Sequence, residues 1–501
     1  MDKGVLSYKN RLIKLLDEGR PGNVMRTAYD TAWVARLGSI DLPMSNQALY
    51  WISNHQLEDG SWGAPEPMYY HDRVISTLAA MTALCRRGLR TSDREQIAKG
   101  LEALERMAGG ATRGLIGDPN GATAGFEMIV PTLVAEAESL GIIKRQGDRI
   151  LGRLSKLREA KLARLNGRTI NRQITMAFSA EMAGPDYCNL LDLDNLQEEN
   201  GSVAYNPSTT AYYALHIRPG DPAALAYLHR VVGEDGGGPI AAPFDVYERA
   251  WVLWNVALTG CCEEEEMLLH CKPHLERLEA AWNVGLGVGF GTGYSIHDGD
   301  DTSLVSAVLC TFNRPVDLEA IYSYQEADHF RCFNLEVNPS ISTNVHFLDV
   351  FRRLKFPQNH PSIQRILGYL RASRVGDRYW HDKWHVSPYY TSAHLVIACS
   401  GYDSELVSET VDWILQSQNE DGSWGYFAPT AEETAYALQA LCFWHMQSGS
   451  VQKSVIRRGA AWLEAHSEPP YPALWIAKTL YYSEWVVRSE ILSALILAEQ
   501  V

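Results

Sequence analysis

The chain has 501 residues, of which 46% are hydrophobic and 21% are charged, so it has the composition of a globular protein with room for two or three domains. Its net charge of -15 argues against nucleic acid as the main partner, because phosphate binding needs a basic surface. The nine cysteines are scattered and form no C-x-x-C pair, and no apolar run reaches the roughly 18 residues that a membrane helix needs. We therefore expect a reduced, cytoplasmic protein without stable membrane insertion.

The chain repeats a short pattern at its two ends. "WISNHQLEDGSWG" at 51–63 matches "WILQSQNEDGSWG" at 413–425 in a Trp-Ile pair, a Gln and a Gly-Ser-Trp-Gly turn. Weaker copies occur at 192–203, at 369–380 and from Trp462 onward. The spacing of the later copies, 44 and then 49 residues, is typical of an architecture built from one supersecondary unit per repeat.

Each unit reads as a helical hairpin. An amphipathic helix precedes the Gly-containing turn, and a second helix rich in Ala, Thr and Leu follows it. Strand signals are sparse, so we predict an all-α chain of stacked hairpins closed into α/α barrels, with the second helices inside. We expect Gln56, Trp62, Gln418 and Trp424 to have structural roles. The predicted inner helices cover 76–84, 208–217, 301–309, 391–398 and 431–441.

Three aspartates crowd the start of one predicted inner helix. In "YSIHDGDDTSLVSAVL" (294–309), Asp298, Asp300 and Asp301 lie within four positions. They could cap the helix, with Asp300 or Asp301 accepting backbone N–H bonds. They could also bind a metal, but no acidic residue follows one turn later, so a D-D-x-x-D site is missing.

A third role for the cluster is general acid catalysis. Closely spaced carboxylates cannot all ionise, and burial in an apolar pocket favours the neutral form further. A neutral carboxylic acid kept away from water can protonate an alkene if aromatic faces stabilise the resulting cation. The chain has 14 Trp and 24 Tyr. We expect Trp251, Trp254, Tyr389 and Tyr390 to line such a pocket.

The D-x-D-D motif together with the Gln…Gly-Ser-Trp repeats resembles the class II terpene cyclases. The pattern looks most similar to bacterial two-domain enzymes of the halimadienyl or kolavenyl diphosphate synthase type. The resemblance implies two α/α domains, called β and γ in that family, with the active site at their interface. It assigns residues 1–20 to an N-terminal helix of the β domain, 21–275 to a γ-like domain and 276–501 to a β-like domain carrying D-x-D-D. Segments in the family's order are 26–38, 125–133, 200–215, 298–303 and 382–390.

The resemblance also assigns site residues. Asp300, the middle acid of D-x-D-D, matches the proton donor, and Asp298 and Asp301 are expected to hold it and tune its acidity. Asn344 in "SISTNVHF" resembles the Asn that hydrogen-bonds the donor acid.

A second group of residues is expected to bind a diphosphate. Glu127 in "GFEMIVP" resembles the acidic residue near the diphosphate and its Mg²⁺, which makes it the candidate metal ligand. Lys161 and Lys383 resemble the basic residues that grip the diphosphate. Trp384 follows Lys383 in the same "DKW" motif and is included in the binding site.

The sequence departs from the plant ent-copalyl diphosphate synthases at two polar positions. The His of a "HSLEG"-like stretch is replaced by Phe178, and the Asn after a Gly-Gly-x-Pro stretch is replaced by Ile240. In the plant enzymes these residues hold the terminating water base. Without that base the early cation survives longer, so we expect a rearranged halimadane or clerodane skeleton, with copalyl diphosphate left open.

The resemblance thus implies an isomerase of the intramolecular lyase type. Its substrate is geranylgeranyl diphosphate, its cofactor is Mg²⁺, and its product keeps the diphosphate for a downstream class I diterpene synthase or phosphatase. Two alternatives remain open at this point. One is a squalene-hopene-type cyclase acting on an uncharged triterpene, and the other is a non-catalytic α/α scaffold that binds prenyl groups.

Overall fold

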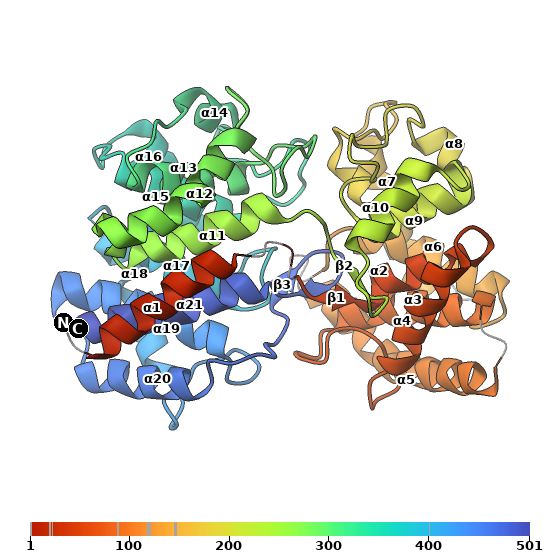
Figure 1. The fold of residues 1–501 in the computed structure, drawn as a ribbon, viewed down its shortest axis with the longest axis horizontal. Helices are drawn as coiled ribbons and strands as arrows, with labels where there is room; N and C mark the ends of the chain where they lie inside the picture. Colours follow the sequence, from red (N-terminus) through yellow and green to blue (C-terminus); the bar gives the residue numbers. More distant parts are fainter. Residues whose placement is uncertain are drawn as a thin grey trace.

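The molecule consists of two helical domains lying side by side (Figure 1). Both chain ends belong to one of them, which we call the terminal domain, while residues 28–228 supply the core of the other, the inserted domain. The computed structural model describes residues 3–19, 22, 24–87, 90–117, 122–144, 148–399 and 401–501.

The terminal domain is an α/α barrel. Its inner helices contact one another in sequence, and the last contacts the first, so the ring closes. The inner ring consists of α11 (Asp245–Leu258), α13 (Gly299–Thr311), α15 (Ile341–Arg353), α17 (Pro388–Ala398), α19 (Ala431–Ser448) and α21 (Glu484–Gln500). The outer layer consists of α1 (Lys3–Glu18), α12 (Glu265–Ala281), α14 (Leu318–Ser323), α16 (Pro361–Ala372), α18 (Ser404–Gln416) and α20 (Lys453–Ala465), with the short η4 (Cys261–Glu263) between α11 and α12.

The inserted domain has a similar but smaller ring. Its inner elements are α2, α4, α6, η2 and α9, each in contact with the next, and α9 returns to α2. The inner bounds are α2 (Ala28–Ala35), α4 (Tyr70–Arg87), α6 (Phe126–Ser139), η2 (Thr175–Asp186) and α9 (Pro207–Tyr212). The other elements are η1 (Leu37–Ser39), α3 (Leu42–Asn54), α5 (Thr91–Gly117), α7 (Asp148–Ala163), α8 (Tyr187–Leu190), η3 (Tyr213–Ile217) and α10 (Pro222–Val231).

Inner and outer helices differ in how they distribute apolar residues. Every residue of α19 from Ala431 to Cys442 is buried, because this helix packs on both the ring and the outer layer. The outer helix α18 instead buries one stripe, formed by Leu406, Val407, Thr410, Val411 and Ile414. The prediction that the second helix of each hairpin lies inside is confirmed. In the part of the chain that the structure describes, no helix is both long and apolar enough to cross a membrane.

The repeated Gln and Trp residues tie each hairpin to its neighbour. Gln418 Nε2 donates to a carbonyl of its own turn and to the carbonyl of Val455 in α20, both at 3.0 Å. Trp424 is fully buried, and its Nε1 donates to a carbonyl in α18 at 2.7 Å. Gln56 and Trp62 make the same kinds of bonds in the inserted domain. The structural role predicted for these residues is confirmed.

The packing argues for a different domain boundary from the one expected from the sequence. α11 and α12 fall before residue 275, in the range assigned to the γ-like domain, yet α11 is part of the terminal ring. The buried residues of 240–278 belong to the core of the terminal domain, as do those of α1. We therefore propose that the boundary lies near residue 240. The apolar faces of α11 and α12 decide this, because both are buried against terminal-domain helices.

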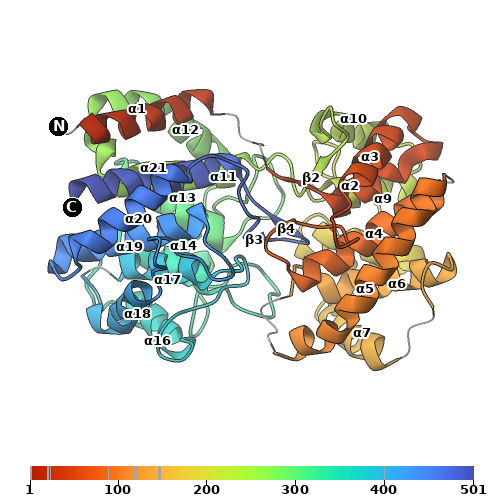
Figure 2. The same ribbon diagram turned by 90° about the horizontal axis from the view of Figure 1, so that it is seen from below.

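Two small antiparallel sheets lie where the domains meet. β1 (Arg26–Thr27) pairs with β2 (Gly238–Pro239) at the two crossings of the chain between domains, with Thr27 opposite Gly238. β3 (Trp475–Ile476) and β4 (Leu480–Tyr481) form a hairpin that projects from the terminal domain toward the inserted domain (Figures 1 and 2).

The tip of the β3–β4 hairpin is anchored in the inserted domain. Lys478 is fully buried, and its Nζ donates to Glu181 at 2.7 Å and to Asn206 and Ser208, each at 2.9 Å. The carbonyl of Ala477 accepts from Ala124 N at 2.8 Å. A buried, fully paired ammonium tolerates little displacement, so this anchor fixes how the domains face each other.

Candidate active site

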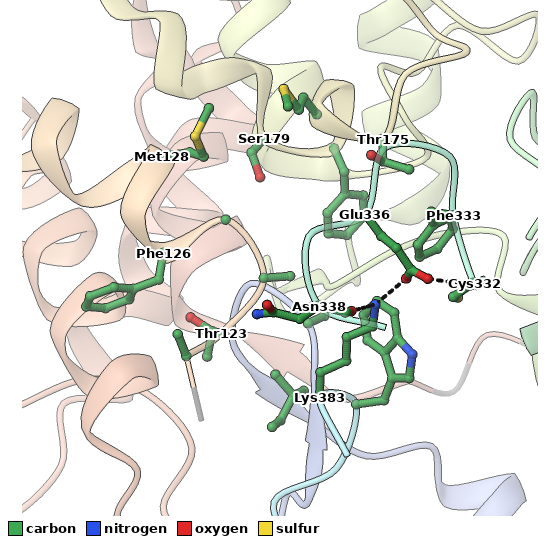
Figure 3. A pocket seen from close by; sticks show the side chains of 18 of the residues that line it. Thr123, Phe126, Met128, Thr175, Ser179, Cys332, Phe333, Glu336, Asn338 and Lys383 are labelled. Atoms are coloured by element: carbon green, nitrogen blue, oxygen red, sulfur yellow. Dashed lines mark hydrogen bonds and ion pairs between the residues drawn. The ribbon is translucent and has the colours of Figure 1, made fainter. Parts of the chain in front are cut away.

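A cavity of about 580 Å³ opens between the two domains (Figure 3). Its volume is typical of a site for a small molecule. The inserted domain contributes residues around α6, α7 and η2, and the terminal domain contributes the start of α13, the 332–338 loop and the β3–β4 hairpin. Its aromatic lining consists of Phe126, Phe178, Phe244, Tyr247, Phe290, Tyr294, Phe333, Trp384, Trp475 and Tyr481.

The three aspartates line this cavity at the N-terminus of α13. Asp298 is the N-cap, because its side chain accepts from the backbone N–H of Asp301 at 2.8 Å. The alternative in which Asp300 or Asp301 caps the helix is therefore wrong. With Asp298 capping from outside the helix, Asp300 in the first turn keeps its carboxylate for other partners.

Asp300 is held by two side chains of α15. Its Oδ1 accepts from the hydroxyl of Thr343 at 2.9 Å and pairs with Nδ1 of His346 at 3.0 Å. The Asp300 side chain is 17% exposed and faces the cavity, whereas His346 is buried. Thr343 and His346 are three positions apart and so share one face of the helix.

Burial shapes the ionisation of the other two aspartates. Burial raises the pKa of Asp298 to about 7, and the charge of Asp300 pushes in the same direction. Burial, followed by the charges of Asp298 and Asp300, raises the pKa of Asp301 well above its usual range. Asp298 and Asp301 therefore retain protons near neutral pH more readily than free carboxylates do.

Asn344 does not contact Asp300. It is fully buried, and its amide donates to the carbonyls of Phe330 and Ser340 and accepts from Phe330 N, at 2.8 to 3.0 Å. The expectation that it hydrogen-bonds the acid is corrected, because one position along a helix turns the side chain by about 100° from Thr343. Asn344 instead fixes the loop before the 332–338 segment.

Sequence reasoning missed His346 and Asp382. His346 lies in the "SISTNVHF" stretch, three positions after Thr343, and this helical spacing could have identified it as a partner of Asp300. Asp382 accepts from Ile341 N at 2.6 Å and Ser342 N at 3.0 Å and precedes Lys383, so it links the start of α15 to the "DKW" motif. Nothing in the spacing from 341 to 382 indicates that contact.

The four aromatic residues expected in the pocket lie behind it. Trp251, Trp254, Tyr389 and Tyr390 are buried in the barrel core and do not line the cavity. Trp251 packs edge-on against His346, with ring centroids 5.3 Å apart, and so supports the acid indirectly. Trp251, Trp254 and Tyr390 pack around His394 inside the ring. Tyr389 instead faces outward and stacks on Trp413 of the outer helix α18, with ring centroids 4.6 Å apart.

The predicted basic residues occupy another part of the same cavity. Lys161 in α7 forms an ion pair with Glu127 in the first turn of α6. Across the domain interface, Lys383 Nζ donates to Glu336 at 2.7 Å and lies 4.9 Å from the centroid of the Trp384 ring. The fold thus brings together all eight predicted site residues except Asn344, which does not line the cavity.

Lys383 is held in its charged form. Burial opposes the charge, but the electrostatic effects of Cys332 and Glu336 and the hydrogen bond to Glu336 outweigh it, so the pKa of Lys383 is raised. Both lysines are therefore paired with carboxylates in the protein alone. An anion that enters the cavity meets two ammonium groups that are already positioned.

The donor set fits a magnesium ion only together with a phosphate ligand. Among the described residues, no three His, Cys, Asp or Glu side chains gather closely enough to hold a metal. Glu127 supplies one buried carboxylate at the cavity wall. Mg²⁺ is commonly bound by one or two carboxylates plus substrate phosphates, so Glu127 can serve as one ligand of a substrate-bound ion.

Comparison with known proteins agrees with this geometry. The squalene-hopene cyclase C-terminal domain model matches residues 324–478. A "Type B diterpene cyclase" of Mycobacterium tuberculosis is 46% identical over 492 residues, covering 97% of this chain and 98% of its own. An ent-copalyl diphosphate synthase of a Streptomyces species is 31% identical, covering 90% of this chain and 88% of its own.

A solved structure shares the whole architecture. The ent-copalyl diphosphate synthase from Streptomyces platensis superposes with a TM-score of 0.80 at 26% identity, covering 99% of this chain and 100% of that one. The two α/α domains that the resemblance implies are thus confirmed. The similarity extends over nearly the whole chain and includes both domains that enclose the aspartates, and the chain belongs to the class II diterpene cyclases, a family of isomerases.

Proposed function

We propose that this enzyme cyclises geranylgeranyl diphosphate to a rearranged bicyclic diterpenyl diphosphate of the halimadienyl or kolavenyl type. The observation that carries the proposal is one cavity lined both by the aspartates of α13 and by two ammonium groups. A long apolar chain with an anionic head matches that division of charge.

Asp300 is the proton donor in this proposal. Its Oδ1 is occupied by Thr343 and His346, which leaves Oδ2 to carry the proton into the cavity. Transfer of that proton to the terminal alkene forms a tertiary cation, and attack by the next double bonds closes two rings. Aromatic faces along the cavity stabilise the cation by roughly 0.5–2 kcal/mol per contact.

The diphosphate stays bonded to the substrate carbon chain, because the residues around it bind its oxygens and do not promote its departure. Lys161 and Lys383 bind its oxygens, Trp384 packs over the ammonium group of Lys383, and Glu127 would contribute one ligand to Mg²⁺. A Mg²⁺ ion bound there would neutralise part of the diphosphate charge. A class I diterpene synthase or a phosphatase would then consume the product.

The apolar residues Phe178 and Ile240 support a rearranged product. Both line the cavity at the positions where the plant enzymes are expected to hold a terminating water. Without a polar group there, early proton loss is disfavoured, and hydride and methyl shifts precede it.

The test is incubation of the purified enzyme with geranylgeranyl diphosphate and Mg²⁺, followed by dephosphorylation and identification of the alcohol by mass spectrometry and NMR. A rearranged bicyclic alcohol is expected, and a copalyl alcohol would overturn the product assignment. Turnover of squalene would favour a triterpene cyclase. If neither the wild type nor Asp300→Asn turns over the substrate, a prenyl-binding scaffold would be favoured.

A further inference from the structure

The segment Cys332–Asn338, which we call the strap, runs along the cavity from the acid to the lysines. Each of its residues except Asn334 lines the cavity. The strap belongs to the terminal domain, and Figure 3 shows Cys332, Glu336 and Asn338 close to Lys383.

The Glu336 side chain holds both ends of this arrangement. Its Oε1 accepts from the backbone N–H of Cys332 at 2.9 Å, and its Oε2 accepts from Lys383 Nζ at 2.7 Å (Figure 3). Lys383 donates a further bond to the carbonyl of Asn338 at 2.9 Å. Glu336 and Lys383 are only 9% and 18% exposed, so water screens their attraction poorly.

The strap is also attached at the acid and to the other domain. The carbonyl of Cys332 accepts from Gly299 N at 2.8 Å, between Asp298 and Asp300 at the start of α13. From the inserted domain, Arg164 donates to the carbonyl of Glu336 at 2.9 Å. The strap thus connects the acid, a lysine and both domains through a few directional bonds.

In the protein alone, Glu336 is paired with the Lys383 ammonium group that a diphosphate would need to bind. A diphosphate carries more negative charge than one carboxylate, and it would approach Lys383 from the cavity. The two anions would then repel each other across the same cation. Displacement of Glu336 would also remove the acceptor of Cys332 N and loosen the strap beside α13.

We propose that Glu336 is a positioning residue that holds Lys383 and the strap in place until a diphosphate displaces it. This inference rests on the proposed function, in which Lys383 binds the diphosphate. Through Glu336, the strap would respond to binding of the substrate diphosphate. The strap also contacts the start of α13, which carries the acid proposed to protonate the terminal alkene.

The first test measures binding of inorganic pyrophosphate by calorimetry, with and without Mg²⁺. Glu336→Gln removes the competing charge and retains an acceptor for Cys332 N, so we expect about tenfold tighter binding in both conditions. Glu326→Gln is the matched control, because Glu326 pairs with Arg331 at the protein surface and does not line the cavity, and it should bind like the wild type.

The outcomes separate the two proposals. If Lys383→Met binds pyrophosphate as well as the wild type does, the proposed diphosphate site fails. If Lys383→Met weakens binding but Glu336→Gln does not strengthen it, only the inference about Glu336 fails. If Glu336→Gln binds pyrophosphate more weakly than the wild type does, and only when Mg²⁺ is present, Glu336 acts as a metal ligand and its role as a competitor is overturned.

The second test follows the strap itself by hydrogen exchange in the intact wild-type protein. Saturating pyrophosphate should speed exchange of the Cys332–Asn338 amides, because Cys332 N loses its acceptor. The Glu326→Gln variant should respond equally. Unchanged or slower exchange of the strap would contradict the inference, even if pyrophosphate binds at Lys383.

Discussion

The proposed acid end and the proposed diphosphate end of the cavity are built in contrasting ways. At the acid end, two inner helices of one barrel, α13 and α15, carry Asp300, Thr343 and His346. At the other end, Glu127 and Lys161 come from the inserted domain and Glu336 and Lys383 from the terminal domain. One end is assembled within a rigid ring, and the other depends on the meeting of two domains.

The contrast follows from the two tasks. Protonation of an alkene needs an acid kept neutral, dry and aimed, so its partners are buried and fixed. Binding and release of a diphosphate need cations that exchange one anion for another. Lys161 and Lys383 are each paired with one carboxylate at the cavity wall, where an entering anion can compete for the ammonium group. Mutations at the two ends should therefore affect different steps.

The largest effect is expected from Asp300→Asn. The amide has the shape of the acid but no proton to donate, so kcat/KM should fall by roughly 10⁴-fold. Pyrophosphate affinity should stay within a factor of about 2, since the lysines are untouched. Steady-state kinetics and calorimetry measure the two quantities, and substantial remaining turnover would refute the assignment of Asp300 as the donor.

His346→Phe should lower kcat by about 10²-fold with little change in KM, because Asp300 loses one partner while packing against Trp251 is retained. Asn344→Ala is the comparison variant. It leaves buried carbonyls unpaired, so it should lower the free energy of unfolding by about 1–3 kcal/mol and affect kcat less than His346→Phe does. The reverse ranking of the two variants in kcat would restore Asn344 as the partner of the acid.

The lysines should affect KM more than kcat. Lys383→Met removes the more buried ammonium group and should raise KM by roughly 100-fold, whereas Lys161→Met, with a side chain that is 34% exposed, should raise it by roughly tenfold. Salt should weaken the Lys161 contribution more. Equal losses in kcat at unchanged KM would show that these residues act on the chemical step instead.

A separate effect concerns the pH dependence of stability rather than of activity. Burial raises the pKa of Asp298 from its ordinary 3.8 to about 7, so the folded protein keeps a proton that the unfolded chain releases. The contribution of Asp298 to stability therefore falls as the pH rises from about 4 to about 7, by at most about 1.4 kcal/mol per pH unit. Asp298→Asn retains an N-cap acceptor and removes this dependence.

Urea unfolding of the wild type and of Asp298→Asn across this pH range checks that expectation. The stability of the variant relative to the wild type should increase steadily from pH 4 to pH 7. A constant difference between the two proteins would mean that Asp298 ionises alike in the folded and unfolded states.

Much of the architecture could be predicted from local patterns in the sequence. The Gly-containing turns, the amphipathic outer helices and the inner helices rich in Ala, Thr and Leu repeat along the chain, so the hairpins and their inside–outside order could be predicted. Asp300 could be identified for the same reason, since D-x-D-D lies on contiguous residues at a helix start.

Contacts between distant segments were decided only by the tertiary structure. The sequence alone determined that an acid cluster, lysines and apolar helices are present; the fold determined that His346 rather than Asn344 faces Asp300 and that Glu336 binds Lys383. It also assigned α11 and α12 to the terminal barrel. The physical reason is that helix rotation, domain packing and ion pairing depend on which surfaces meet in space, and spacing along one chain does not specify that.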